Sequence, residues 1–98
     1  MAQGDIFCNG VTEVAAGDFI DMKPPLTNEA VVHNIAIGPG SWELQIYDDT
    51  SNKSIVLDKD TAPSFLTQQF LHCKPTSFYR VKCITGPILV HYDGVITK

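Results

Sequence analysis

The chain has 98 residues, of which 44% are apolar and 18% are charged, and its net charge is −4 at neutral pH. This composition excludes an intrinsically disordered chain, and the length suits one domain with its own core, so we expect residues 1–98 to form a single domain. The acidic balance argues against nucleic acid as a partner, and the absence of an apolar run near the ~20 residues that span a bilayer argues against a membrane.

The N-terminal part of the sequence indicates short strands separated by turns. Asn9-Gly10 is a typical hairpin turn, because glycine accepts positive φ at little cost, so we expect the strands on either side of it to pair with each other. A third strand is expected over 19–22. Pro24 and Pro25 end it, because proline lacks the N–H that a β-ladder needs, and the chain around them should be extended.

The middle of the sequence has the strongest strand patterns. Residues 29–37 are rich in β-branched residues and include neighbouring apolar positions, which indicates local burial on both faces. Residues 41–48 alternate between apolar and polar, as in a half-buried strand, and Trp42 is the expected core anchor. A short strand is expected over 55–57, followed by a polar loop over 58–64.

Residues 65–73 fit two patterns. Phe65, Gln69 and Cys73 would share one face of a helix, whereas Leu66, Phe70 and the residues that alternate with them would share one face of a strand. Periodicity alone does not separate the two for so short a run. Because the surrounding pattern is β, we favour a strand.

The C-terminal segment, 77–98, is predicted to be a three-stranded antiparallel meander. Gly86-Pro87 interrupts its first apolar run, and Asp93-Gly94 resembles a hairpin turn. Period-two alternation divides the first strand into an inward face and an outward face. The inward set is Tyr79, Val81 and Cys83, and the outward set is Phe78, Arg80 and Lys82.

Together these elements amount to about eight or nine short strands without a convincing helix. We therefore predict an all-β fold, a small antiparallel β-sandwich with jelly-roll or related Greek-key connections. An immunoglobulin-type sandwich is the alternative, since Cys8, Trp42 and Cys73 follow its Cys…Trp…Cys order. Against it, the tyrosine expected two residues before the second cysteine is Leu71 here.

The charges are divided unevenly along the chain. Of the 11 acidic residues only Asp93 follows Asp60, whereas most of the basic residues do: Lys74, Arg80, Lys82 and Lys98. If the two parts of the chain form different surfaces, the molecule has an acidic and a basic side, which suits packing between identical subunits. If antiparallel strands from both parts interleave, the charges mix and no such polarity follows.

Three histidines and three cysteines raise the question of a metal site. Structural zinc sites use closely spaced ligand pairs, and here only His72 and Cys73 are adjacent, with side chains that diverge if the segment is a strand. A calcium loop is unsupported as well, because the acidic residues do not follow its pattern. These acidic residues are Asp48, Asp49, Asp58 and Asp60. We expect no metal and no cofactor.

A nucleophile paired with a base is also not evident. Cys83 and His91 could face each other across the Gly86-Pro87 connection, but core packing explains Cys83 better. No phosphate loop, dinucleotide motif or nucleophile elbow occurs. We therefore expect no catalytic residues and a protein that is not an enzyme.

The odd number of cysteines excludes a complete internal disulfide framework. The chain start lacks the basic and apolar regions of a secretory signal, so we expect it to stay in a reducing cytosol with its cysteines as thiols.

Assembly is the activity that the sequence favours. A sandwich this small leaves open sheet edges, and the short apolar strand at the C-terminus either pairs with the N-terminal strand or reaches a neighbour. The outward set on the preceding strand mixes an aromatic residue with cations, a composition common at interfaces. The candidate interface residues are Phe78, Arg80, Lys82, Val95 and Ile96.

Three motifs carry a family resemblance: Val32-His33-Asn34-Ile35, Tyr79-Arg80-Val81-Lys82, and the terminal run from Tyr92 to Lys98. With them the chain resembles small β-rich virion proteins of tailed bacteriophages, of the head decoration (cement) type. The resemblance implies a structural virion protein, made in the host bacterial cytoplasm, that self-associates as a homotrimer and binds the major capsid protein or another virion protein.

The same resemblance leaves a second setting open, a tail or fibre module that recognises a host glycan or protein. Trp42, Tyr47 and Tyr92 would then be the contact residues. A small enzyme or metal-binding protein that uses His33, His72 or His91 is the third alternative.

Overall fold

The computed structural model describes residues 1–98 as ten β-strands without a helix. It therefore contains no helical segment long and apolar enough to cross a membrane. The strands are β1 (Ile6–Cys8), β2 (Thr12–Val14), β3 (Phe19–Asp21), β4 (Ala30–Ile37), β5 (Ser41–Asp48), β6 (Lys53–Asp60), β7 (Ser64–Leu66), β8 (Leu71–Cys73), β9 (Ser77–Thr85) and β10 (Ile88–Ile96).

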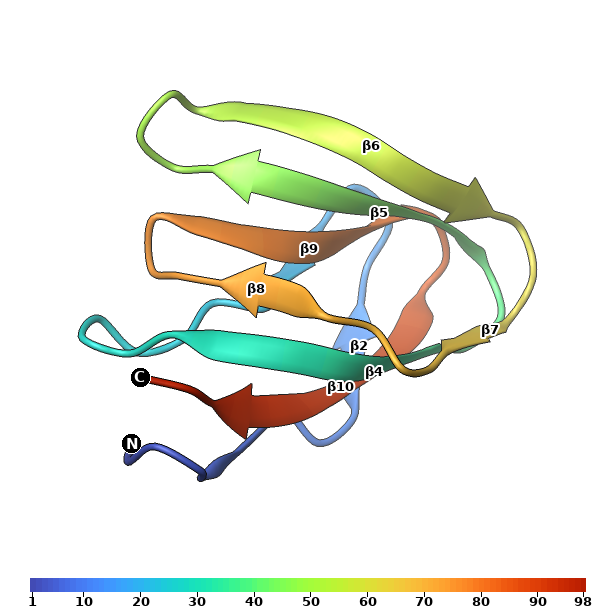
Figure 1. The fold of residues 1–98 in the computed structure, drawn as a ribbon. Coiled ribbons are helices and arrows are strands. Elements are labelled where there is room, and N and C mark those ends of the chain that lie inside the picture. Colours follow the sequence, from blue (N-terminus) through green and yellow to red (C-terminus); the bar gives the residue numbers. More distant parts are fainter.

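Two antiparallel sheets face each other (Figure 1). The first sheet has the order β1-β10-β4-β7, with β2 also paired to β10 and β8 also paired to β4; the second has the order β3-β9-β5-β6. Since β1 and β2 share one side of β10, and β7 and β8 share one side of β4, the six strands of the first sheet fill four positions. With the four of the second sheet this makes eight positions.

The chain visits these positions in jelly-roll order. It passes from β1 and β2 in the first sheet to β3 in the second, then back to β4. It continues through β5 and β6 in the second sheet, returns to β7 and β8, and ends with β9 in the second sheet and β10 in the first. The predicted all-β sandwich with jelly-roll connections is confirmed, and the immunoglobulin alternative is wrong.

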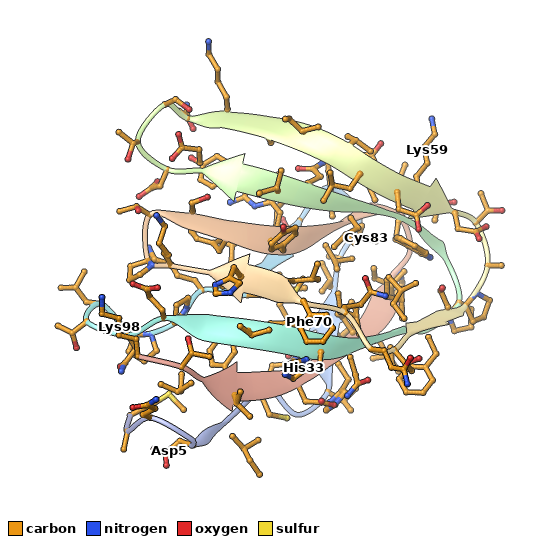
Figure 2. All side chains as sticks on the ribbon, viewed as in Figure 1. Asp5, His33, Lys59, Phe70, Cys83 and Lys98 are labelled. Atoms are coloured by element: carbon orange, nitrogen blue, oxygen red, sulfur yellow. The ribbon has the colours of Figure 1, made fainter.

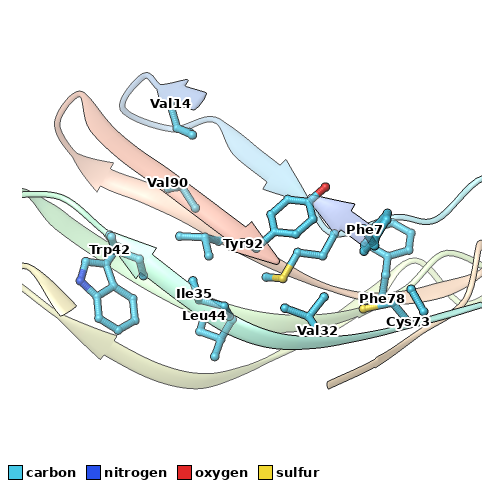
Figure 3. Packing of buried hydrophobic residues seen from close by; sticks show 14 of the residues in the cluster. Phe7, Val14, Val32, Ile35, Trp42, Leu44, Cys73, Phe78, Val90 and Tyr92 are labelled. Carbon is cyan, nitrogen blue, oxygen red and sulfur yellow. The ribbon is translucent and has the colours of Figure 1, made fainter. Parts of the chain in front are cut away.

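The core lies between the two sheets and consists of 17 buried residues (Figure 3). Trp42 of β5 lies in it, as expected of the core anchor, and its indole Nε1–H donates to the Ala62 carbonyl at 3.0 Å. Ile35 of β4 and Val81 of β9 come from opposite sheets and are fully buried. Each such side chain stabilises the fold by about 1.5–3 kcal/mol relative to leaving it in water.

The expected N-terminal hairpin is wrong. β1 and β2 do not pair with each other; each pairs with a different end of β10. Asn9 fills the gap between them, because its side chain donates to the Val90 carbonyl at 3.0 Å and accepts the Tyr92 N–H at 2.8 Å. The dipeptide that looked like a hairpin turn is therefore a bend within an interrupted edge strand, with Gly10 at a φ of 74°.

The expected C-terminal meander is also wrong. β9 and β10 lie in different sheets, so the Gly86-Pro87 connection crosses the sandwich. Asp93-Gly94 is not a turn but a β-bulge inside β10, where the register with β4 shifts. The Asp-Gly dipeptide suggested a hairpin turn, but the residues before and after it both pair with β4. A bulge of this kind cannot be distinguished from a turn without the partner strand.

Two further boundaries differ from expectation. β6 covers Lys53–Asp60, well beyond the predicted 55–57 and into the predicted loop, because it pairs along the whole of β5. Residues 65–73 are not helical, and they belong to two strands, β7 and β8, with a break at 67–70. The break between them contains Gln68 at a φ of 56°, which takes the chain out of the ladder.

The charges interleave. Strands from the acidic and the basic parts of the chain alternate in the first sheet, and in the second sheet β9 lies between β3 and β5, so each sheet contains strands from both parts. Arg80 pairs with Asp21 at 2.9 Å, and Lys98 with Glu29 at 3.9 Å. Cations from the later part of the chain thus meet carboxylates from the earlier part.

Candidate functional sites

The five residues predicted to form an interface do not lie together on the surface of the protein. Phe78 and Ile96 are core residues, with exposed fractions of 2% and 1%, so neither is available to a partner and both assignments are wrong. Val95 is half-buried in a central strand, between Ile6 of β1 and Val31 of β4. Of the two alternatives for the C-terminal strand, pairing with the N-terminal strand is the one that occurs.

Phe78 was misplaced because alternation does not show what covers a face. The Tyr47 ring lies 5.6 Å from the Phe78 ring, and the ammonium of Lys23 lies 5.6 Å from it as well. These neighbours come from β5 and from the segment after β3. They bury a residue that the pattern within β9 assigned to solvent.

Arg80 and Lys82 belong to an ordered group of side chains that we call the Arg80 cluster: Phe19, Asp21, Tyr47, Arg80 and Lys82. The Arg80 guanidinium carbon lies 3.9 Å from the Tyr47 ring centre and 4.3 Å from the Phe19 ring centre. Its Nε–H donates to the Asp21 carboxylate at 2.9 Å. The Lys82 ammonium lies 5.6 Å from the Phe19 ring centre, so two cations lie close to one aromatic ring.

This cluster is ordered before any partner binds. The Arg80 side chain is only 13% exposed and is held on two sides, whereas Phe19 remains exposed. Arginine and aromatic side chains supply much of the energy of protein interfaces, and side chains that are already ordered lose less entropy on binding. The cluster is thus suited to anchor a partner.

The other edge of the same sheet is β6, which pairs only with β5. β6 lies at the outer edge of the sandwich (Figure 1), and all of its residues are exposed. Three consecutive apolar residues stand in its middle, with exposed fractions of 65% for Ile55, 47% for Val56 and 50% for Leu57. An edge strand with one open side and exposed apolar side chains is a template for pairing with another chain.

β6 also has features that limit indiscriminate pairing. Charged residues flank the apolar centre, namely Lys53, Asp58, Lys59 and Asp60. The register with β5 shifts between Leu44 and Gln45, which marks a bulge. Charges and bulges are the usual means by which natural edges restrict which strands can add to them.

A polar array lies across the other sheet, formed by Cys8 of β1, Asn34 of β4, and His91 and Asp93 of β10. His91 Nε2 lies 2.9 Å from one Asp93 oxygen, and the Asn34 amide donates to the other at 2.7 Å. His91 Nδ1 is hydrogen-bonded to the Gly10 carbonyl and lies 4.0 Å from Cys8 Sγ. Three strands therefore contribute to one array.

The contacts of the array shift two pKa values in opposite directions. The pKa of His91 is raised, chiefly by its hydrogen bond to Asp93 and then by that to the Gly10 carbonyl. The pKa of Asp93 is lowered, chiefly by the Asn34 amide, with a further contribution from His91. Since both ring nitrogens of His91 face acceptors, the doubly protonated imidazolium satisfies the site best.

The sequence pointed to a different cysteine beside His91. Cys83 was the candidate partner of His91, but it is fully buried in the core. It therefore serves the packing role that was the preferred interpretation of this residue. Cys8 takes that place, because β1 pairs with β10 in a register that sets Cys8 opposite Asp93. The spacing of His91 and Asp93 on one strand was a usable signal, but the supposed hairpin turn at Asp93-Gly94 concealed it.

The three residues considered as contacts for host recognition do not form one exposed surface. Trp42 and Tyr92 are buried, so they are not surface contacts, and Tyr47 belongs to the Arg80 cluster. The exposed Phe70 lies instead beside His33, with a ring separation of 5.4 Å (Figure 2). His33, Asn34, Gln68 and Phe70 line an open hollow of about 540 Å³.

No group of three or more histidine, cysteine, aspartate or glutamate residues is arranged to hold a metal ion. Asp48 and Asp60 lie near opposite ends of the β5–β6 ladder and do not converge. His72 is exposed and Cys73 is buried, as expected of neighbours on a strand, and burial raises the pKa of the Cys73 thiol to about 11.

No protein-family model matches the chain, and no curated protein matches it.

Proposed function

We propose that the chain is a non-enzymatic structural protein that self-associates, and that it acts as a head decoration protein of a tailed bacteriophage, bound to the major capsid protein. The β6 edge carries the self-association part, because it leaves both apolar side chains and backbone groups without partners. The phage setting is supported by the resemblance of the sequence motifs.

Burial of the β6 edge supplies a driving force for assembly. Ile55, Val56 and Leu57 would each gain up to about 1.5–3 kcal/mol if a partner covered them fully. Added backbone pairing would satisfy the open side of the strand. The two lysines and two aspartates of β6 cancel, so a second copy meets no net charge repulsion there.

A trimer requires that β6 meets a different surface of the next copy, since a closed ring with three-fold symmetry uses head-to-tail contacts. The Arg80 cluster is the proposed counterpart. It lies toward the opposite edge of the same sheet, on β3, β9 and β5, and it offers an exposed Phe19 among ordered side chains. On a capsid, the same contacts would add cohesion across subunit junctions.

Native mass spectrometry of the purified chain tests self-association. We expect a metal-free trimer for the natural sequence and a monomer for Ile55→Lys and Leu57→Lys, because a buried lysine charge opposes the contact. Leu26→Lys is the matched control, since Leu26 is an exposed leucine in the loop between β3 and β4, and it should remain trimeric. A monomeric natural chain would contradict the proposed self-association.

The phage setting needs a separate test. Particles stripped of this protein should rebind the purified chain at many copies per particle, and rebinding should restore resistance to heat or osmotic shock. Failure to rebind would count against the decoration role without affecting the oligomer measurement.

The hollow beside Phe70 favours a second candidate, a tail or fibre module that recognises a host glycan or protein. An exposed aromatic ring next to amide and imidazole groups suits ligands with both apolar and polar faces. A few copies per particle, together with loss of host binding in Phe70→Ser, would favour this candidate over the decoration role.

A further inference from the structure

Cys8 differs from the other two cysteines in both access and surroundings. Cys8 is exposed, whereas Cys73 and Cys83 are buried. The Gly10 N–H donates to Cys8 Sγ at 3.3 Å, and His91 Nδ1 lies 4.0 Å from the same sulfur. The Gly10 N–H is thus directed at an exposed sulfur that has an imidazole beside it, and the thiolate is the form of cysteine that attacks disulfides.

The imidazole beside this sulfur is fixed on both sides. Asp93 holds Nε2 and is itself held by Asn34, while the Gly10 carbonyl holds Nδ1. The titratable groups that face the array are Asp93 on β10, Cys8 on β1 and, acting on Asp93, His33 on β4. A cation held next to an exposed sulfur is the arrangement that activates cysteines elsewhere.

Space for a small reactant lies next to the imidazole. A shallow hollow of about 250 Å³ is lined by His91 together with apolar residues of three neighbouring segments. Val11, Ala36 and Leu89 are among these residues. The hollow could hold the part of a small molecule that does not react.

We propose that Cys8 is a covalent modification site that undergoes thiol–disulfide exchange with small soluble disulfides, with His91 as the neighbouring proton donor. The Cys8 thiolate attacks one sulfur of the disulfide, so that a new S–S bond forms to Cys8 as the original S–S bond breaks. The electron pair of the broken bond leaves with the second sulfur as a thiolate. That thiolate takes a proton from the His91 imidazolium, and the products are a mixed disulfide on Cys8, a small thiol and neutral His91.

The experiment uses the folded chain and 4,4′-dithiodipyridine, a disulfide whose released thiopyridone is measured by absorbance. We expect one equivalent to be released rapidly from the native chain, and none rapidly from Cys8→Ser. At about pH 6, His91→Gln should slow the rapid phase about tenfold, because the variant lacks both the cation beside the sulfur and the proton donor for the departing thiolate. At about pH 9 the two rates should converge.

His72→Gln is the matched control, because His72 is an exposed histidine away from the array, and its rate should equal that of the natural chain. Asp93→Asn gives a second variant, expected to slow the reaction at low pH while its side chain still accepts from Asn34. Circular dichroism identifies any variant that fails to fold, in which case the other variant carries the comparison. Equal low-pH rates for the His91→Gln and His72→Gln chains, or rapid release from Cys8→Ser, would overturn the proposal.

Discussion

At the scale of single residues, the sequence pattern placed Arg80 on an outward face but did not show which side chains surround it. Arg80 was expected to face a neighbouring subunit, yet it stacks between Tyr47 and Phe19 and pairs with Asp21 within its own chain. Because its guanidinium lies against two rings and its Nε–H donates to Asp21 within the same chain, its first role is to join β3, β9 and β5. Any role in binding rests on this intramolecular order.

Replacing Arg80 tests its contribution to stability. Arg80→Ala should lower the free energy of unfolding by about 1–2 kcal/mol, because it removes stacking on two rings together with a partly buried ion pair. Urea denaturation followed by Trp42 fluorescence measures the change. Lys53→Ala, at an exposed position on β6, should remain within about 0.5 kcal/mol of the natural chain, and a similar small change for Arg80→Ala would show that the stacking contributes little.

The His91–Asp93 pair should make stability depend on pH. The raised pKa of His91 means that its contribution is complete below the ordinary histidine value of 6.5 and is lost as pH rises through the folded value. The lowered pKa of Asp93 means that its contribution is present above 3.8 and is lost as pH falls through the folded value. The pair therefore stabilises most between these ordinary values.

The corresponding measurement compares the natural chain with His91→Gln by thermal or urea unfolding from about pH 5 to about pH 9. The stability difference should be largest near pH 5, at about 1 kcal/mol at most for so exposed a pair, and should shrink toward pH 9. His72→Gln should show no such trend. A difference that grows with pH would have the wrong sign for this array.

At the scale of elements, hydrophobic alternation located strands better than it identified their partners. The bounds of β5 agree with the predicted 41–48, because one of its faces lies on the core and the other on the surface. β10 was divided at Asp93-Gly94, because a dipeptide that favours a turn also suits a bulge. Local turn chemistry is the same in both cases, and only the neighbouring strand distinguishes them.

Gly94 is the residue on which the β10 bulge depends. A Cβ at this position would clash with the Val31 carbonyl oxygen and lie 2.7 Å from the Val32 Cα, both backbone atoms of β4. Gly94→Ala should therefore destabilise the protein by about 3 kcal/mol or more, because strands in the middle of a sheet cannot separate cheaply. Chemical denaturation measures the loss.

Gly4→Ala is the control for the Gly94 experiment. Gly4 has a φ of 89° but nothing within 4 Å of its Cβ position, so its substitution carries only the backbone cost of about 1 kcal/mol. If both substitutions cost the same, the close approach of β4 to Gly94 would not be the cause.

At the scale of the whole molecule, the jelly roll brings the two chain ends together (Figure 1). The Gly4 N–H donates to the Ile96 carbonyl at 2.8 Å, and the Asn28 amide donates to the carbonyls of both Met1 and Lys98. The fold therefore depends on pairing between segments that are far apart in sequence. The intervening strands connect the two ends through both sheets.

A circular permutant tests this organisation. Joining Lys98 to Met1 with a short glycine–serine linker and opening the chain between Thr50 and Ser51, in the exposed β5–β6 turn, should leave a cooperatively folded protein. Opening it instead between Val90 and His91, inside β10, should prevent folding, because β10 pairs with β1, β2 and β4. Circular dichroism and thermal melting distinguish the two results.

By itself, the sequence determined the all-β class, the approximate strand positions and Trp42 as a core residue, because each depends on periodicity and spacing within a few residues. The tertiary structure decided which strands pair, that Phe78 and Ile96 are buried, that β6 is left with an open edge, and that Cys8 rather than Cys83 lies beside His91. These features depend on strand register and on segments that cover one another across the sandwich. Such contacts join residues far apart in the chain, so they cannot be read from the pattern of side chains within a few neighbouring residues.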